Sequence, residues 1–226
     1  MLFRSGAKMT DELIAEKIRV ILVDDHNVVR SGLRRLLELG GDIEVVAEAD
    51  SGEQACQIYG DFQADVLVMD LSMPGIGGLE ALRRILSVAP KAKVIIFTMH
   101  ENTAFATQAL SSGARCYVAK SSLADDLLLA VREAAAGKTY ISPSIAQKIV
   151  LQSISGSPEP VERLSSREFE VFRLLAEGAG IDDIANNLQI SQKTAANYQT
   201  ILKQKLGITN AVELVRLAIR HGVILD

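Results

Sequence analysis

The chain has no tryptophan, only two cysteines and an aromatic content of 4%. The cysteines, Cys56 and Cys116, lie far apart in apolar surroundings without a paired spacing. This pattern favours two buried thiols over a disulfide or a metal site. Redox chemistry and cysteine-ligated metals are therefore not expected.

Long apolar segments are absent as well. No window approaches the roughly 18 uninterrupted apolar residues of a membrane span, and residues 1–17 carry charges of both signs, unlike a signal peptide. These absences predict a cytoplasmic protein without membrane contact. Residues 1–17 are interpreted as an N-terminal extension in which either Met1 or Met9 is the start.

An excess of basic charge is also missing. The chain has 24 Lys and Arg residues against 28 Asp and Glu residues, a net charge of −4. The part up to Pro160 accounts for this charge, with 16 basic and 20 acidic residues, whereas residues 161–226 have 8 of each. A neutral C-terminal part is a weak electrostatic footprint for nucleic acid.

What the chain does contain is a repeated alternation of two patterns. Short apolar runs typical of strands alternate with stretches whose apolar residues recur at helical spacing. The strand-like runs are Arg19–Val23, Ile43–Ala49, Val66–Met69, Val94–Phe97 and Cys116–Ala119. Because these runs are almost continuously apolar, they predict a five-stranded parallel sheet covered by helices on both faces. Right-handed connections favour a doubly wound, flavodoxin-like α/β fold with strand order 2-1-3-4-5.

The alternation ends near Gly137, and a stretch rich in Ser, Pro and Gly follows. We divide the chain into an extension (1–17), an α/β domain (18–140), a linker (141–160) and a small all-α domain (161–226). In the last part, Ser165 begins a capping box, and helices are expected over 181–188 and 192–206 with a tight turn between them. This arrangement indicates a helix-turn-helix whose second helix is the recognition helix.

Acidic residues at the strand ends carry the chemistry. In the predicted strand order the carboxyl ends of strands 1 and 3 are neighbours, which brings Asp24, Asp25 and Asp70 together. Three carboxylates in one crevice repel one another, and Mg2+ is the hard cation that best relieves this repulsion and also bridges to phosphate oxygens. Thr98 and Lys120 end the fourth and fifth strands and would reach the same crevice. These are the groups needed to accept a phosphoryl group, and we predict Asp70 as the acceptor.

The strand-end residues also match a known pattern. They resemble the receiver domain of two-component response regulators over residues 18–137, at Asp24, Asp25, Asp70, Thr98 and Lys120. The resemblance implies that a sensor histidine kinase phosphorylates Asp70. It implies that Mg2+ is bound by the acidic pair, by Asp70 and by the backbone carbonyl of Ser72. It further implies that Thr98 and Tyr117 form the switch that responds to phosphorylation.

Residues 161–226 resemble the LuxR-type helix-turn-helix output domain of the NarL/FixJ class. The matching segments are LSSRE (164–168), IA (184–185), ISQKT (190–194) and KLGI (205–208). The segments VEL (212–214) and AIRHG (218–222) are similar more particularly to the GacA/UvrY branch. The resemblance implies a transcription regulator, not an enzyme, that binds double-stranded promoter DNA and is a homodimer when phosphorylated.

The expected recognition helix departs from that class. Ala195 and Ala196 stand where a valine and then a polar or basic residue are usual, and alanine cannot donate a hydrogen bond to a base edge. The candidates that remain for DNA contact are Lys193, Thr194, Asn197, Lys203 and Lys205. A second function therefore stays open, namely a phosphorylation-gated protein-interaction module whose helix-turn-helix has lost sequence-specific recognition.

A turnover enzyme built on an aspartyl phosphate is a third interpretation. It would need a second acid two residues after Asp70, where the chain has Ser72. His100 lies two residues beyond Thr98, and it is either without a role or a side chain that influences a hydrolytic water. The sequence favours the transcription regulator over both other interpretations.

Overall fold

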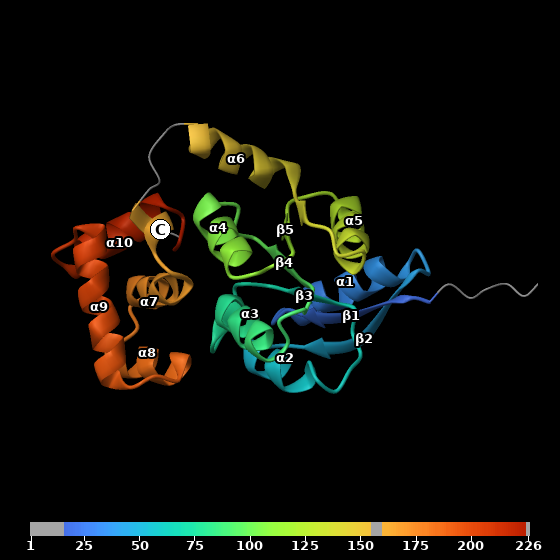
Figure 1. The fold of residues 1–226 in the computed structure, drawn as a ribbon, viewed down its shortest axis with the longest axis horizontal. Coiled ribbons are helices and arrows are strands. Elements are labelled where there is room, and N and C mark those ends of the chain that lie inside the picture. Colours follow the sequence, from blue (N-terminus) through green and yellow to red (C-terminus); the bar gives the residue numbers. More distant parts are fainter. Residues whose placement is uncertain (1–15, 155–159, 225–226) are drawn as a thin grey trace, which may run out of the picture.

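The computed structural model describes residues 16–154 and 160–224 (Figure 1). Its first part is a parallel sheet with the strand order β2-β1-β3-β4-β5-β6. The strands are β1 (Ile18–Val23), β2 (Ile43–Ala49), β3 (Val66–Met69), β4 (Val94–Thr98), β5 (Cys116–Ala119) and β6 (Tyr140–Ile141). The predicted order of the first five strands is confirmed.

The predicted number of five strands is wrong, because β6 adds a sixth strand beside β5. This strand has only two residues, and Tyr140 pairs with Cys116 while Ile141 pairs with Tyr117. A segment this short has no periodicity of its own. It is a strand only because β5 offers backbone partners, so the local sequence does not reveal it.

Helices cover both faces of the sheet, as predicted. They are α1 (Asn27–Glu38), α2 (Gly52–Ile58), α3 (Gly77–Val88), α4 (Thr103–Ser111) and α5 (Ala124–Ala135). Buried residues of α1 and α5, such as Leu37 and Val131, form the core on one face. Buried residues of α2, α3 and α4, such as Leu82 and Phe105, form the core on the other face. The strands are buried between the two cores, which explains why their sequences are almost continuously apolar.

The remaining helices follow the sheet. They are α6 (Pro143–Ile154), the 3-10 helix η1 (Pro160–Arg163), α7 (Ser166–Ala176), α8 (Ile181–Leu188), α9 (Gln192–Leu206) and α10 (Ala211–Arg220). The predicted capping box is present at the start of α7, where Ser165 and Glu168 cap each other's backbone N–H groups. Of the predicted extension and linker, residues 1–15 and 155–159 lie outside the described residues. No helix in the described part of the chain is long and apolar enough to cross a membrane.

The helical domain, from η1 to α10, packs against one side of the α/β domain. Figure 1 shows α7 between α9 and the pair α3 and α4. The core around α3 and α4 continues without a break into the helical domain, where it includes Phe169 and Phe172. An ion pair joins the two domains, because Arg167 Nη1 of α7 lies 2.7 Å from Glu80 Oε2 of α3. Burial disfavours the Glu80 carboxylate, but bonds from Arg84 and Arg83 and the charge of Arg167 outweigh this and lower its pKa.

Candidate phosphoacceptor site and nucleic-acid interface

The carboxyl ends of β1 and β3 bring two acidic residues side by side. Val23 and Met69 are paired in the sheet, so the residues that follow them, Asp24 and Asp70, leave the sheet at the same level. The backbone N–H of Asp70 donates to the carbonyl of Val23 at 2.9 Å. Both side chains are buried, with 1% of Asp24 and 3% of Asp70 exposed. The neighbouring positions expected from the strand order are thus present.

Lys120 holds these two carboxylates together from the end of β5. Its Nζ donates to Asp24 Oδ2 at 2.6 Å and to Asp70 Oδ2 at 2.7 Å. Burial disfavours the ammonium, but the bonds to Asp24 and Asp70 outweigh burial and raise the pKa of Lys120. The side chain therefore stays positively charged between two acids that would otherwise repel each other.

The backbone of the loop after β3 holds the other oxygen of Asp70. Oδ1 accepts from the N–H of Leu71 at 2.6 Å and from the N–H of Ser72 at 3.2 Å. The start of α3 approaches this loop so closely that a Cβ on Gly78 would overlap the carbonyl oxygen of Asp70. Glycine is therefore required at position 78 to keep Asp70 in this orientation.

Asp25 is the third predicted acid, and its position tests whether the acids can bind a metal ion. Its Oδ1 is buried and has no hydrogen-bond donor among the described residues, although His26 Nδ1 lies 2.9 Å away. Ligand atoms of Asp24, Asp25 and His26 lie within 4.8 Å of one another. Carboxylates are the ligands that Mg2+ prefers, and Asp25 offers a carboxylate oxygen beside that of Asp24. The carboxylates of Asp24 and Asp25 therefore fit a hard cation, whereas the parts of Asp70 and of the Ser72 carbonyl in binding it stay predictions.

The predicted switch residues lie on the next two strands, Thr98 at the end of β4 and Tyr117 within β5. Thr98 is fully buried at the end of β4, and its Oγ1 accepts from the N–H of His100 at 3.3 Å. Tyr117 is also fully buried, and its hydroxyl donates to the carbonyl of His100 at 2.7 Å. Burial raises the pKa of Tyr117, and the charges of Asp70 and Glu101 raise it further. Both switch residues are thus held on the backbone of one residue, His100.

His100 is the site residue whose contacts the sequence did not reveal. Its Nε2 and the hydroxyl of Ser72 share a hydrogen bond of 2.7 Å. Burial lowers the pKa of His100, opposed by the charge of Asp70 and assisted by Arg173. Its position two residues after Thr98 was the only signal in the sequence, and that signal does not indicate a partner.

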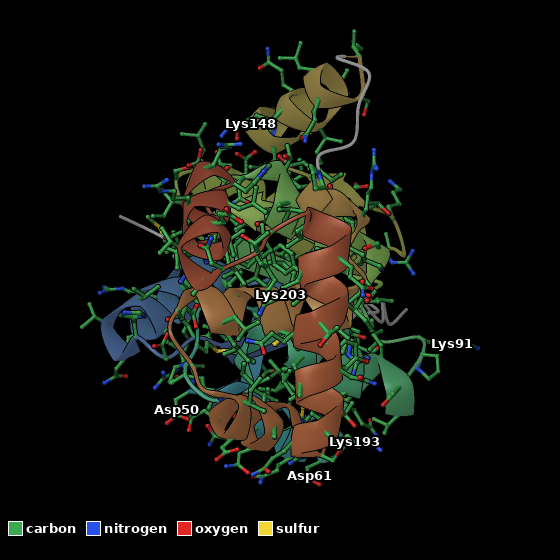
Figure 2. All side chains as sticks on the ribbon, turned by 90° about the vertical axis from the view of Figure 1, so that its left-hand side faces the viewer. Asp50, Asp61, Lys91, Lys148, Lys193 and Lys203 are labelled. Atoms are coloured by element: carbon green, nitrogen blue, oxygen red, sulfur yellow. The ribbon has the colours of Figure 1, made fainter. Side chains whose placement is uncertain are left out.

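The predicted helix-turn-helix consists of α8 and α9. Gln189 adopts a left-handed conformation with φ 54° and ends α8, and Ser191 caps α9 by accepting from the N–H of Thr194. Figure 2 shows α9 at the front of the molecule, on the side away from the sheet, with Lys193 at its beginning. The α/β domain therefore does not cover the recognition helix in this arrangement.

The five predicted DNA-contact residues on α9 are all exposed, but they do not share one face. They are Lys193, Thr194, Asn197, Lys203 and Lys205. Lys193 and Asn197 lie on one face of the helix, because they are four residues apart. Thr200 and Gln204 extend this face, since the four positions follow at i, i+4, i+7 and i+11. Lys205 lies on another side, where its Nζ donates to Glu168 Oε2 at 2.8 Å.

The interpretation of Ala195 as a missing DNA contact is wrong. Ala195 is fully buried, and it lies with Leu202 on the face of α9 that packs into the helical domain. A side chain that points into the core cannot read a base. Only Ala196, which is exposed, replaces a residue on the outer side of the helix. The spacing of Ala195, Tyr198 and Leu202 at i, i+3 and i+7 was a signal that could have shown this.

Comparison with protein families agrees with this geometry. Residues 20–132 match the response regulator receiver domain, and residues 162–218 match the luxR family of bacterial regulatory proteins. The chain belongs to the response regulators that join a receiver domain to a LuxR-type helix-turn-helix. The predictions of a DNA-binding transcription regulator with a phosphorylated receiver domain, and of this family, are confirmed.

Individual relatives refine the placement. The chain is 38% identical to the response regulator GacA of Pseudomonas aeruginosa over 209 residues, which cover 92% of this chain and 98% of GacA. It is 38% identical to the response regulator UvrY of Escherichia coli K12 over 208 residues, which cover 91% of this chain and 95% of UvrY. The structure of RcsB from Salmonella enterica serovar Typhimurium, bound to promoter rprA with the phosphomimetic BeF3−, matches with TM-score 0.73 and 30% identity, covering 89% and 98% of the two chains.

Proposed function

We propose that a sensor histidine kinase phosphorylates Asp70 and that this modification controls DNA binding through α9. The observation that carries the proposal is the bonding of the Asp70 carboxylate. The loop backbone orients Oδ1, and Lys120 holds Oδ2 together with Asp24. An oriented carboxylate beside a fixed ammonium can attack a phosphoryl group and then stabilise the charge that it brings.

The residues of the pocket have separate roles in this reaction. An Asp70 carboxylate oxygen forms a bond to phosphorus while the P–N bond of the kinase phosphohistidine breaks, and the histidine leaves with its electron pair. Lys120 remains protonated and binds a phosphoryl oxygen. Mg2+, held by Asp24, Asp25, Asp70 and the carbonyl of Ser72, would neutralise charge on the phosphoryl oxygens. Thr98 lies at the end of β4, the strand next to β3, and would donate its hydroxyl to the new group.

Phosphorylation would shift an equilibrium between two states of the switch. The Thr98 hydroxyl now accepts from the N–H of His100, and it would turn toward a phosphoryl oxygen. Such a switch works only if one state makes better contacts with the phosphoryl group than the other, and Thr98 and Lys120 supply that difference. In the favoured state the helical domain binds promoter DNA in the cytoplasm.

We also propose that the phosphorylated protein acts as a homodimer. Two RcsB dimers bound to two parallel DNAs form one of the similar structures, with TM-score 0.58 and 31% identity. In this chain, α10 exposes 60% of Val212, an apolar side chain that a second copy could cover. The neutral charge of residues 161–226 makes a dimer useful, because two weak DNA contacts act together when they are joined.

Binding to operator and to random duplex across a range of salt concentrations tests the function. Beryllofluoride with Mg2+ serves as the phosphoryl mimic. We expect the mimic to tighten binding and to produce a preference for the operator. The Asp70→Asn variant is the matched control, since it should bind DNA equally with and without the mimic. The absence of a sequence preference at every salt concentration would instead support the protein-interaction module.

We propose further that the protein is not a turnover enzyme. Ser72 occupies the position two residues after Asp70 where a second acid would be needed, and its hydroxyl is engaged with His100. Incubation with small phosphate esters and Mg2+ tests this statement. Steady release of phosphate, beyond one equivalent per chain, would contradict it.

A further inference from the structure

The output domain is held on one face of α4. Asn102, the N-cap of α4, donates from Nδ2 to the carbonyl of Gly222 at 2.8 Å. Gln108 donates from Nε2 to the carbonyl of Leu164 at 2.7 Å, and the hydroxyls of Ser112 and Ser166 lie 2.6 Å apart. With Phe105 between them, Asn102, Gln108 and Ser112 follow at i, i+3, i+6 and i+10 from cap to cap of α4, so they lie along one side of the helix. Any movement of α4 must therefore disturb the hydrogen bonds that hold the helical domain against it.

A ring contact lies at the centre of the same face. Phe105 of α4 meets Phe169 of α7 edge to face, with ring centroids 5.0 Å apart and an interplanar angle of 82°. Only 2% of Phe105 and none of Phe169 is exposed. Edge-to-face pairs of buried rings stabilise a contact beyond their buried area. This pair is the apolar centre of the interface between the two domains.

His100 joins this ring pair to the phosphorylation site. Its ring stacks on Phe105 with centroids 4.0 Å apart and an interplanar angle of 22°. Its Nε2 is bonded to the hydroxyl of Ser72, and its backbone is bonded to Thr98 and Tyr117. Ser72, Thr98 and Tyr117 thus all contact His100, and the His100 ring contacts Phe105, which packs against α7.

The surroundings of His100 allow its ring to move. The His100 and Phe105 rings line a cavity of about 420 Å³ between the domains, together with Arg173 and Val223. The contact between α4 and the helical domain also leaves one polar atom unsatisfied, because Gln108 Oε1 is buried without a hydrogen-bond partner in the described residues. A buried acceptor without a donor weakens the closed arrangement. The contact between the domains is therefore one that a modest change can open.

We propose that His100 is a positioning residue that couples Asp70 to the output domain, and this inference rests on the proposed phosphorylation of Asp70. A phosphoryl group would take the Thr98 hydroxyl, and the Ser72 carbonyl would help to hold the metal, so the bonds that hold His100 would change. The ring then leaves Phe105, and the Phe105–Phe169 contact loses its support. Phosphorylation in this way loosens α7 from α4.

Two substitutions at position 100 test separately the bond of His100 to Ser72 and the stacking of its ring on Phe105. His100→Phe keeps a ring to stack on Phe105 but removes the bond to Ser72, while the backbone bonds to Thr98 and Tyr117 remain. The output domain should therefore stay docked and should respond less to the mimic than in the wild type. His100→Gln keeps a polar group for Ser72 but removes the stacking ring, so the output domain should be loosened with or without the mimic. Met99→Ala, next in sequence at a side chain that is 69% exposed, is the matched control.

Hydrogen–deuterium exchange of peptides covering 103–111 and 166–176 measures the docking of α4 and α7. In the wild type and in Met99→Ala, beryllofluoride with Mg2+ should speed exchange in both peptides. His100→Phe should exchange slowly without the mimic and should gain less from it than the wild type, and His100→Gln should exchange rapidly in both conditions. Unchanged exchange in peptides covering 18–23 and 94–98 confirms that a variant still has a folded receiver domain.

Affinity for the mimic provides the second measurement, because coupling between two equilibria is reciprocal. Since docking opposes the phosphorylated state, His100→Gln should bind beryllofluoride about fivefold more tightly than the wild type, or better. Wild-type exchange and affinity in both His100 variants would overturn the coupling while leaving phosphorylation intact. Absence of mimic binding to the wild type, with no difference from Asp70→Asn, would instead overturn the proposed function itself.

Discussion

The carboxylate pocket and the outer face of α9 are the two proposed functional regions of this response regulator, and they differ in burial. In the pocket, 1% of the Asp24 side chain, 3% of Asp70 and 10% of Lys120 is exposed, and each group binds another. On α9, Lys193 and Asn197 are exposed, and neither side chain bonds another side chain within residues 16–154 and 160–224. Groups that depend on each other respond to mutation as a unit, whereas separated exposed groups contribute nearly independently. A single substitution in the pocket should therefore abolish its function, whereas each substitution on α9 should weaken DNA binding by a separate, smaller amount.

The largest expected effect is the loss of phosphorylation in Asp70→Asn. An amide is a poor nucleophile, and it also removes one of the two acids that hold Lys120. Labelling by acetyl phosphate with Mg2+, followed on a phosphate-affinity gel, should be abolished. Asp61→Asn, which changes an exposed acid outside the pocket, should be labelled like the wild type. Persistent labelling of Asp70→Asn would mean that another residue is the acceptor.

Lys120→Met should cause the largest loss of stability. Removing one member of a buried ion pair leaves charge without compensation, at a cost of about 3–5 kcal/mol. Here two carboxylates, Asp24 and Asp70, lose their cation together. Urea unfolding with and without Mg2+ measures the effect, and Mg2+ should recover more stability in the variant than in the wild type. If Mg2+ stabilises both equally, the acids do not form the metal site.

Asn197→Ala should have a smaller effect, confined to DNA. An asparagine that bonds a base edge contributes about 1–3 kcal/mol of discrimination, so binding to the operator should weaken by this amount. Binding to random duplex should change little, and the urea midpoint should stay the same because Asn197 is exposed. Equal weakening on both duplexes would assign Asn197 to the DNA backbone instead.

The smallest expected effect is a change in the salt dependence of DNA binding, which should differ between two lysines on α9. Each lysine that contacts phosphate changes the slope of log affinity against log salt by about 1. Lys193→Met should reduce the slope in this way, whereas Lys205→Met should not, because Lys205 Nζ is bonded to Glu168. Lys205 is 45% exposed, and the buried Glu168 carboxylate keeps its bond from the Ser165 N–H, so Lys205→Met should lower stability by only about 1 kcal/mol. A reduced slope in Lys205→Met would show that the lysine leaves Glu168 to bind DNA.

The same difference in burial explains what could be predicted. Strands buried on both faces have continuous apolar sequences, so their positions, their order and the acids at their ends follow from the chain. The start of α7 at Ser165 follows from local capping chemistry. Ala195 was misjudged because alanine is small and neutral, and such a side chain fits either a core or a surface. Its burial is set by the packing of α9 on its neighbours.

Sequence alone determined the sheet order, the acidic pocket and the helix-turn-helix, since each depends on local periodicity or on strand ends that topology must bring together. Tertiary structure alone decided the rest. The strand β6 exists only because β5 offers it backbone partners. The contacts from Ser72 through His100 to α7 exist only because Phe105 and Phe169, which are 64 residues apart, meet between the domains. Contacts between distant segments depend on how whole elements dock, and no local pattern encodes that docking.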